Sequence, residues 1–109
     1  MPDTAVLFPG QGAQRVGMGA DFYERSKAAR VVFDRANDVL GRDLRKLCFE
    51  GPEPELVLTS NCQPAIYVTS AAILACLEEE GRLSRSAIGA TAGLSLGEYT
   101  ALYFAGVFT

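Results

Sequence analysis

Two short apolar segments, each running directly into a glycine-rich turn, constrain the fold of this chain most. Residues 4–8 are apolar and stop at Pro9-Gly10, and residues 87–92 lead into the turn 93–97. Short apolar runs bounded by turn residues are typical of buried strands. The segments between and after them have helical patterns. The order strand, loop, helices, strand, turn and helix predicts an α/β fold with a parallel sheet.

Apolar periodicity and helix-breaking residues predict the helices. They are expected over residues 21–29, 31–40, 43–49, 63–80 and 98–105. Gly41 and Gly81 are natural stops, and Pro64 is placed in the first turn of the longest helix. Residues 51–54 form a turn that is too short to separate two domains.

The longest predicted helix is apolar nearly all round from residue 65 to residue 77. It is therefore expected to be buried on several faces, and it falls short of the ~18 apolar residues that a membrane-spanning helix needs. Three glutamates, Glu78–Glu80, follow at its carboxyl end. We interpret them as a solvated helix terminus.

Composition excludes several classes of site. The 109 residues are 49% apolar and carry a net charge of −3, so a globular domain is expected and general nucleic-acid binding is not. Three cysteines without C-x-x-C spacing favour buried, reduced thiols in a cytoplasmic protein over disulfides or a zinc site. There is no histidine, so no histidine-based site is complete within these residues.

The turn Gly93-Leu94-Ser95-Leu96-Gly97 matches G-x-S-x-G and lies between an apolar strand and a helix. In a nucleophile elbow this arrangement projects the serine hydroxyl above the sheet, at the amino end of the following helix. The N–H of Leu96 would then be one donor of an oxyanion hole. The alternative is a Gly/Ser turn in which Ser95 merely caps the helix.

The loop after the first strand, residues 10–14, fits neither common phosphate-binding pattern. Arg15 stands at the third glycine of G-x-G-x-x-G, and Met18 stands at the lysine of the P-loop. The loop is then either a backbone laid close to a substrate, with Gln11 as a polar contact, or a plain strand-to-helix turn.

Three blocks of the sequence resemble, in the same order, the malonyl-CoA:acyl-carrier-protein transacylases of fatty-acid synthesis and the related acyltransferase domains of polyketide synthases. The blocks are residues 8–14 with 17–19, residues 63–65, and residues 95–102 with 105–106. Cys62 stands where the family usually has Thr. The resemblance covers essentially the whole chain.

The resemblance implies the N-terminal part of an acyltransferase domain, with an α/β-hydrolase-like parallel-sheet core and a strand–elbow–helix nucleophile turn. Residues 1–109 are then expected to be the N-terminal portion of a single malonyl-transferase-like domain, truncated at its C-terminus.

The resemblance also implies a ping-pong mechanism in which Ser95 carries the malonyl group. Gln11 and Leu96 are implied as oxyanion-hole donors through their backbone N–H groups. Gln63 matches a residue that lines the same pocket. Leu94 stands where the family usually has His beside the nucleophile, and we expect it to contact the substrate.

The partners implied are malonyl-CoA and the phosphopantetheine thiol of acyl carrier protein, with no bound cofactor, metal, nucleic acid or membrane. The family's histidine base and its malonyl-binding arginine are expected past Thr109, so the chain alone is expected to be inactive. Three alternatives stay open: a polyketide-synthase-type acyltransferase, a serine hydrolase that shares the elbow, and a non-catalytic fragment.

Overall fold

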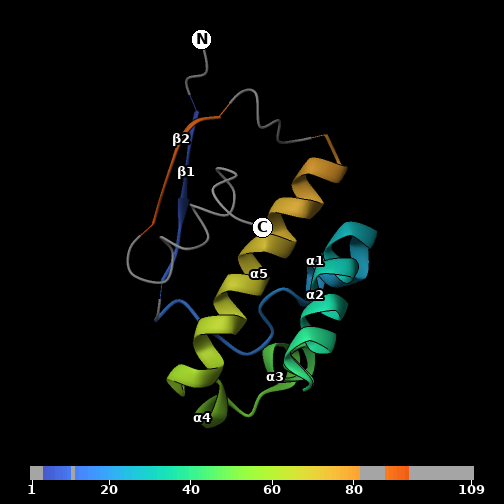
Figure 1. Cartoon of the computed structure of the whole chain (residues 1–109), viewed down its shortest axis with the longest axis vertical. Coiled ribbons are helices and arrows are strands. Elements are labelled where there is room, and N and C mark those ends of the chain that lie inside the picture. The colour runs from blue at the N-terminus through green and yellow to red at the C-terminus, as the bar shows by residue number, and fades with distance from the viewer. Residues whose placement is uncertain (1–3, 11, 82–87, 94–109) are drawn as a thin grey trace.

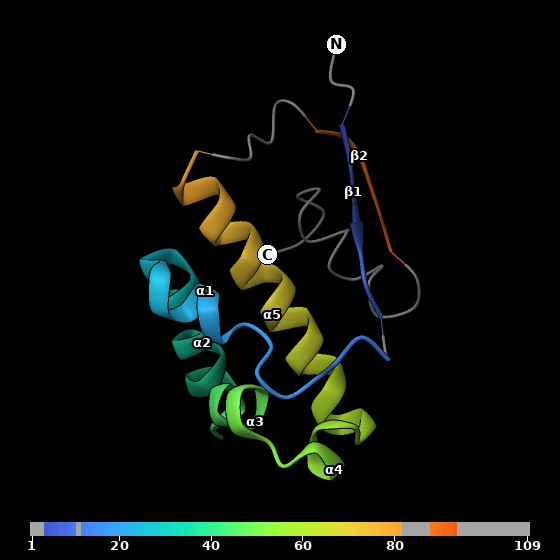
Figure 2. The same ribbon diagram turned by 180° about the vertical axis from the view of Figure 1, so that it is seen from behind.

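The computed structural model describes residues 4–10, 12–81 and 88–93 of the chain. In chain order its elements are β1 (Thr4–Phe8), α1 (Ala20–Arg25), α2 (Lys27–Leu40), α3 (Leu44–Glu50), α4 (Glu53–Leu56), α5 (Thr59–Glu79) and β2 (Ile88–Gly93). In Figures 1 and 2, α5 runs between the two strands and the helices α1 to α3. Both predicted strands form, but Leu7 of β1 is 77% exposed and not buried as the pattern predicted. The predicted helix 98–105 lies outside the described residues.

The two strands pair in parallel, as their sequence order predicts. The register runs from Ala5 opposite Ala90 to Phe8 opposite Gly93, with one irregularity between Thr4 and Ala5. The carboxyl ends of β1 and β2 therefore meet at the same edge. The chain crosses between the strands through all five helices, and α5 returns antiparallel to them (Figure 1).

The first two helices break at Ser26, so the predicted helix over residues 21–29 is wrong at its end. Ser26 has an extended backbone (φ −127°, ψ 125°), and its Oγ accepts the N–H of Ala29. Serine is a favoured N-cap because its side chain satisfies a backbone donor of the first helical turn. At the other end of α2, Gly41 has φ +67° and ends the helix as predicted.

The longest helix begins earlier than the sequence predicts. Its first residue is Thr59 rather than Gln63, so Pro64 lies inside α5 and not in its first turn. The expected turn over residues 51–54 also runs into a short helix, because α4 begins at Glu53. Pro64 requires a local compensation, since proline cannot donate the helical hydrogen bond at its own position.

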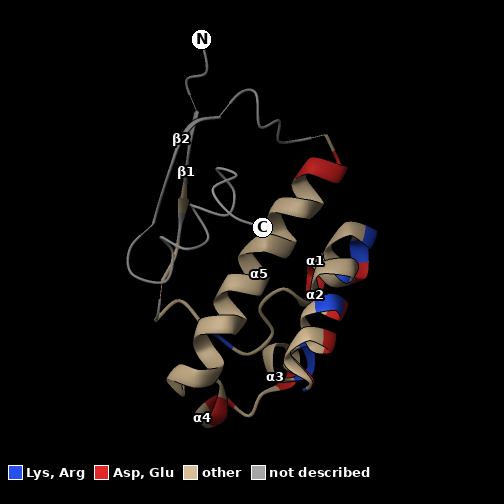
Figure 3. Cartoon of the chain, in the orientation of Figure 1, with Lys and Arg blue, Asp and Glu red and all other residues tan. Residues whose placement is uncertain are grey.

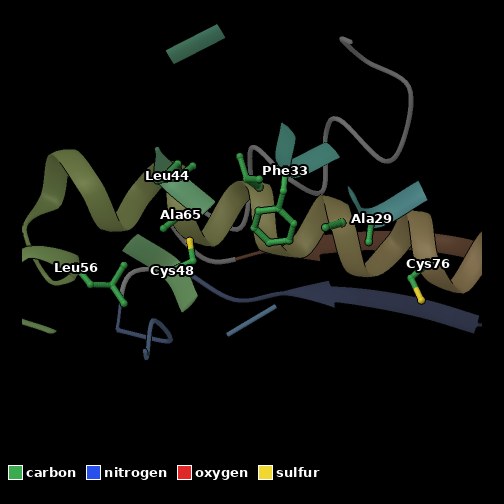
Figure 4. Packing of buried hydrophobic residues seen from close by; sticks show 9 residues of the cluster. Ala29, Phe33, Leu44, Cys48, Leu56, Ala65 and Cys76 are labelled. Atoms are coloured by element: carbon green, nitrogen blue, oxygen red, sulfur yellow. The ribbon is translucent and has the colours of Figure 1, made fainter. Parts of the chain in front are cut away.

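The core lies where α2 and α3 pack on α5, as Figure 4 shows. The expected burial of α5 is confirmed, because all residues from Ala65 to Ala72 except Tyr67 are buried and so occupy several faces of the helix. Phe33 is fully buried and meets the rings of Tyr23 and Phe49 edge-on, with centroids 6.0 and 5.1 Å away. All three cysteines are free and buried, as the sequence predicts.

The glutamates at the carboxyl end of α5 are exposed, as the sequence interpretation predicts, and two of them also bind neighbouring helices. Glu79 accepts hydrogen bonds from the Ser26 hydroxyl (2.9 Å) and from the Ala28 N–H (3.0 Å). Glu80 forms a bidentate ion pair with Arg25, at 2.9 and 2.7 Å. Figure 3 shows that α5 carries charge at this end alone, whereas charges are frequent on α1 to α4. The acidic end of α5 is therefore a clamp on α1 and α2.

Within the described ranges, no helix combines the length and the apolar character needed to cross a membrane.

Candidate functional site

The parallel pairing brings the starts of the two candidate segments together. Phe8, the last residue of β1, lies opposite Gly93, the last residue of β2. The glycine-rich loop follows the first strand, and the G-x-S-x-G turn follows the second. In α/β sheets, ligands bind outside the carboxyl ends of the strands. The amino end of α5 lies at this end of the molecule too (Figures 1 and 2).

A backbone hydrogen bond joins Gly10 and Ala13 at the start of the loop after β1. The N–H of Ala13 donates to the carbonyl of Gly10 at 3.2 Å. Gly12 has φ +109°, a left-handed conformation that favours glycine. The Gln14 side chain accepts the N–H of Gly12 through Oε1 at 2.8 Å. Gln14 therefore holds the backbone of the loop at Gly12.

The rest of the loop is anchored to the helical layer. The N–H of Gly17 donates to the carbonyl of Cys48 in α3 (2.7 Å). Gly19 lies directly against Phe33, because a Cβ at Gly19 would come within 2.7 Å of the Phe33 ring. Its φ of +84° favours glycine as well. The loop is thus fixed at its far end to the buried core.

Gln63 is the one predicted site residue that the described part of the chain contains. It is half-buried in α5, immediately before Pro64. The carbonyl of Ser60, four residues before Pro64, accepts a hydrogen bond from Nη2 of Arg42 (3.0 Å). The other terminal nitrogen of the same guanidinium, Nη1, donates to the side-chain oxygen of Asn61. The helix turn that carries Gln63 is thus held from outside α5.

The other predicted site residues lie outside the described residues. They are Gln11, Leu94, Ser95 and Leu96. Their roles stay predictions, and so do the alternatives in which the turns are merely structural.

The structure adds two residues that sequence reasoning missed, Gln14 and Arg42. Gln14 stood inside a recognised block, so its place two residues after Gly12 was a usable signal. No local pattern marked Arg42, because its partners lie 18 and 19 residues further along the chain.

A separate apolar groove of about 580 Å³ runs between α2 and α5. Its lining includes Val39, Leu40, Pro64 and Tyr67, and it includes no predicted site residue. Burial raises the pKa of the Cys48 thiol to about 11, so this thiol is protonated at neutral pH. Among the described residues, no three His, Cys, Asp or Glu side chains come together as metal ligands. None of these features adds a nucleophile or a metal centre.

Comparison with known proteins identifies the family. The sequence model of the acyl transferase domain family matches residues 6–109. The malonyl CoA-acyl carrier protein transacylase of Bacillus subtilis strain 168 is 47% identical over all 109 residues, which cover 33% of that protein. The chain spans between about a quarter and a third of the length of the curated malonyl-CoA-acyl carrier protein transacylases it matches.

Solved structures agree with the sequence match. The malonyl CoA-acyl carrier protein transacylase from Clostridium perfringens superposes with a TM-score of 0.86 at 45% identity, over 96% of this chain and 32% of that chain. A second structure is a type II PKS acyl-carrier protein in complex with its malonyl-transacylase. It gives a TM-score of 0.84 at 44% identity, over 94% of this chain and 32% of that chain. The chain therefore belongs to the acyl transferase domain family and shares the fold of its members.

Proposed function

We propose that the protein to which this chain contributes transfers a malonyl group from malonyl-CoA to the phosphopantetheine thiol of acyl carrier protein. The observation that carries the proposal is the family match over residues 6–109, together with 47% identity to a malonyl CoA-acyl carrier protein transacylase across the whole chain. Identity at this level over the whole chain is far more specific than the G-x-S-x-G pattern alone.

The proposed fold is an α/β-hydrolase-like core to which β1 and β2 contribute neighbouring parallel strands. The turn after β2 is then a nucleophile elbow, with Ser95 at its apex. The parallel register supports this arrangement, because it brings the start of that turn beside the loop that contains Gln11. A nucleophilic serine and the donors of its oxyanion hole must be neighbours, because they act on one carbonyl.

In the first half-reaction, Ser95 Oγ attacks the thioester carbonyl carbon of malonyl-CoA while a general base takes its proton. The N–H groups of Gln11 and Leu96 stabilise the negative oxygen of the tetrahedral intermediate. The carbon–sulfur bond then breaks, and CoA leaves as the thiol after receiving the proton. The product is a malonyl ester of Ser95.

In the second half-reaction, the phosphopantetheine thiol of the carrier attacks the same carbonyl. The bond between the carbonyl carbon and the Ser95 oxygen breaks, and the serine is reprotonated. Gln63 and Leu94 line the pocket in this proposal. The 109 residues contain no histidine, so the base is assigned to a part of the protein outside them. The chain alone is therefore expected to turn over negligibly.

A second candidate has the same chemistry and a different carrier. One structural relative is a malonyl-transacylase in complex with a type II PKS acyl-carrier protein. This observation favours a polyketide carrier as the alternative acceptor. The two candidates differ in which carrier is loaded faster, and not in the residues of the site.

The test is acylation of the full-length gene product by malonyl-CoA, followed by intact mass spectrometry. A parallel sample uses a chimera in which residues 1–109 replace the matching part of the Bacillus subtilis relative. We expect one malonyl group per protein in the wild type, and a loss of about 10³-fold or more in acyl-carrier loading with Ser95→Ala. Ser84→Ala is the matched control, because Ser84 lies in none of the three blocks.

Two outcomes would contradict the proposal. Ser95→Ala with wild-type loading would remove the proposed nucleophile. Release of free malonate without loading of either carrier would indicate a hydrolase instead.

A further inference from the structure

Pro64 leaves one backbone carbonyl of α5 without its usual helical donor. In an α-helix the N–H of each residue donates to the carbonyl four residues earlier. Proline has no N–H, so the carbonyl of Ser60 cannot receive this bond. A carbonyl near a helix end then needs a donor from elsewhere or from water.

Arg42 supplies that donor. Its Nη2 lies 3.0 Å from the Ser60 carbonyl oxygen, and its Nη1 donates to the Asn61 side-chain oxygen. Asn61 in turn donates from Nδ2 to the carbonyl of Glu55 in α4 (2.9 Å). One planar guanidinium thus holds two neighbouring residues of the first turn of α5, and Asn61 ties that turn to α4.

The base of Arg42 is itself fixed. Gly41 ends α2 with φ +67°, and the N–H of Leu44 donates to the Arg42 carbonyl at 3.1 Å. Asp43 caps α3 by accepting the N–H of Lys46 at 3.0 Å, and it also accepts from the Asn37 amide at 2.8 Å. The guanidinium is therefore presented from a closed corner between two helices and not from a free loop.

We propose that Arg42 is a positioning residue for the acyl-transfer site. By bonding the carbonyl that Pro64 leaves free, it fixes the turn over residues 60–64 and so sets the direction of Gln63. This inference rests on the proposed function, in which Gln63 lines the malonyl pocket. In this proposal Pro64 removes a helical donor and Arg42, 22 positions earlier, replaces it, and neither residue touches the substrate.

Arg30 provides a matched control because it makes the same kind of contact elsewhere. Its guanidinium donates to the carbonyls of Tyr23 (2.8 Å) and Glu24 (2.7 Å) at the end of α1. Those carbonyls lie on a different helix from Gln63. Arg30→Gln therefore removes a clamp of equal chemistry without releasing the turn that carries Gln63.

The experiment is a double-mutant cycle in the full-length protein with Arg42→Gln, Pro64→Ala and the double variant. Pro64→Ala restores an N–H that can donate to the Ser60 carbonyl, so the role of Arg42 becomes redundant. We expect Arg42→Gln to lower kcat/KM for acylation by malonyl-CoA about tenfold with Pro64 present, and about twofold with Ala at position 64. Amide exchange within residues 59–66 should rise in the first case and stay near the wild-type rate in the second.

Two further variants separate positioning from stability. Arg42→Lys keeps the charge but loses the planar fork, so it should recover part of the rate and not all of it. Arg30→Gln should lower the melting temperature and leave kcat/KM at the wild-type value.

The inference is overturned if Arg42→Gln acylates at the wild-type rate, or if its loss is the same with Pro64 and with Ala at position 64. An equal loss of kcat/KM in Arg30→Gln would also contradict the inference, because Arg42 would then act only through the general stability of the protein. A wild-type protein that is not acylated at all would overturn the proposed function instead. In that case the exchange measurement still decides whether Arg42 holds the turn.

Discussion

The two ends of α5 are held by different chemistry. At the carboxyl end, Glu79 and Glu80 bind Arg25, Ser26 and Ala28, so the contacts there involve ionised carboxylates. At the amino end, Arg42 donates to neutral oxygens of Ser60 and Asn61. Each end is tied to the α1–α3 layer by one arginine.

The difference lies in what each clamp holds. The carboxyl-end clamp, formed by Glu79 and Glu80 with their partners, joins the end of α5 to the end of α1 and the start of α2. It contains none of the predicted site residues. The amino-end clamp holds a backbone turn that contains Gln63. Side-chain ion pairs at the surface contribute little to stability on average. A charged donor on a carbonyl without a helical partner instead fixes a defined backbone geometry. The comparison assigns the joining of helix ends to one end of α5 and the fixing of backbone geometry to the other.

The largest expected effect comes from the buried core and not from either clamp. Phe33 is fully buried in the core between α2 and α5, so Phe33→Ala should lower the free energy of unfolding by about 3–5 kcal/mol. Urea denaturation measures this loss. Val31→Ala on the same helix is the control, because Val31 is 63% exposed and its loss should stay within about 0.5 kcal/mol. Equal losses of unfolding free energy in the two variants would contradict this, because burial of Phe33 would then contribute no more than an exposed side chain.

A pH titration isolates the amino end. Cys48 is buried in the cluster that contains Ala65 (Figure 4), and burial raises the pKa of its thiol from 9.0 to about 11. Between these values the unfolded thiol loses its proton and the native thiol keeps it. The stabilisation from the neutral thiol is thus present below pH 9 and lost as the pH rises toward 11.

The wild type should therefore lose about 1.4 kcal/mol of unfolding free energy per pH unit more than Cys48→Ala in this window. Urea denaturation at a series of pH values gives both slopes. Parallel slopes would mean that the Cys48 thiol ionises as easily in the native state as in the unfolded chain.

The smallest expected effect is that of salt concentration on the melting temperature, and it distinguishes the two ends of α5. The Debye length falls from about 10 Å at 0.1 M to about 3 Å at 1 M ionic strength, so exposed ion pairs weaken. The drop in melting temperature caused by Arg25→Gln should shrink on raising the salt concentration. The drop caused by Arg42→Gln should change less, because its acceptors carry no net charge. If both drops shrink equally, the two clamps are electrostatically the same.

Local sequence predicted much of the fold. The apolar runs predicted both strands, Gly41 predicted the end of α2, and the all-round apolar pattern predicted the burial of α5. Contacts between distant residues could not be predicted in this way. The glutamates at the end of α5 find Arg25 and Ser26 more than 50 positions away, and no periodicity encodes such a pairing.

Local patterns marked the glycine-rich loop and the turn around Ser95 as separate segments, and the family resemblance implied that both share a pocket with Gln63. Neither gave the register in which the two strands end side by side. That register, with Phe8 opposite Gly93, came from the structure. Arg42 could not be found, because its task follows from Pro64 lying inside α5 rather than at its start. The sequence placed Pro64 in the first turn of the helix, where its missing N–H leaves no carbonyl without a donor. The need for Arg42 at the Ser60 carbonyl therefore could not be seen.

The parallel pairing of β1 with β2 also has a consequence for synthesis on the ribosome. Ile88 follows Phe8 by about 80 residues, so at ~5–20 residues per second β1 waits roughly 4–16 s for its partner to be made. The helices are translated in that interval and can dock on one another before the strands meet. The sheet edge at which both candidate segments begin therefore forms late during translation of this chain, after the helices have been made.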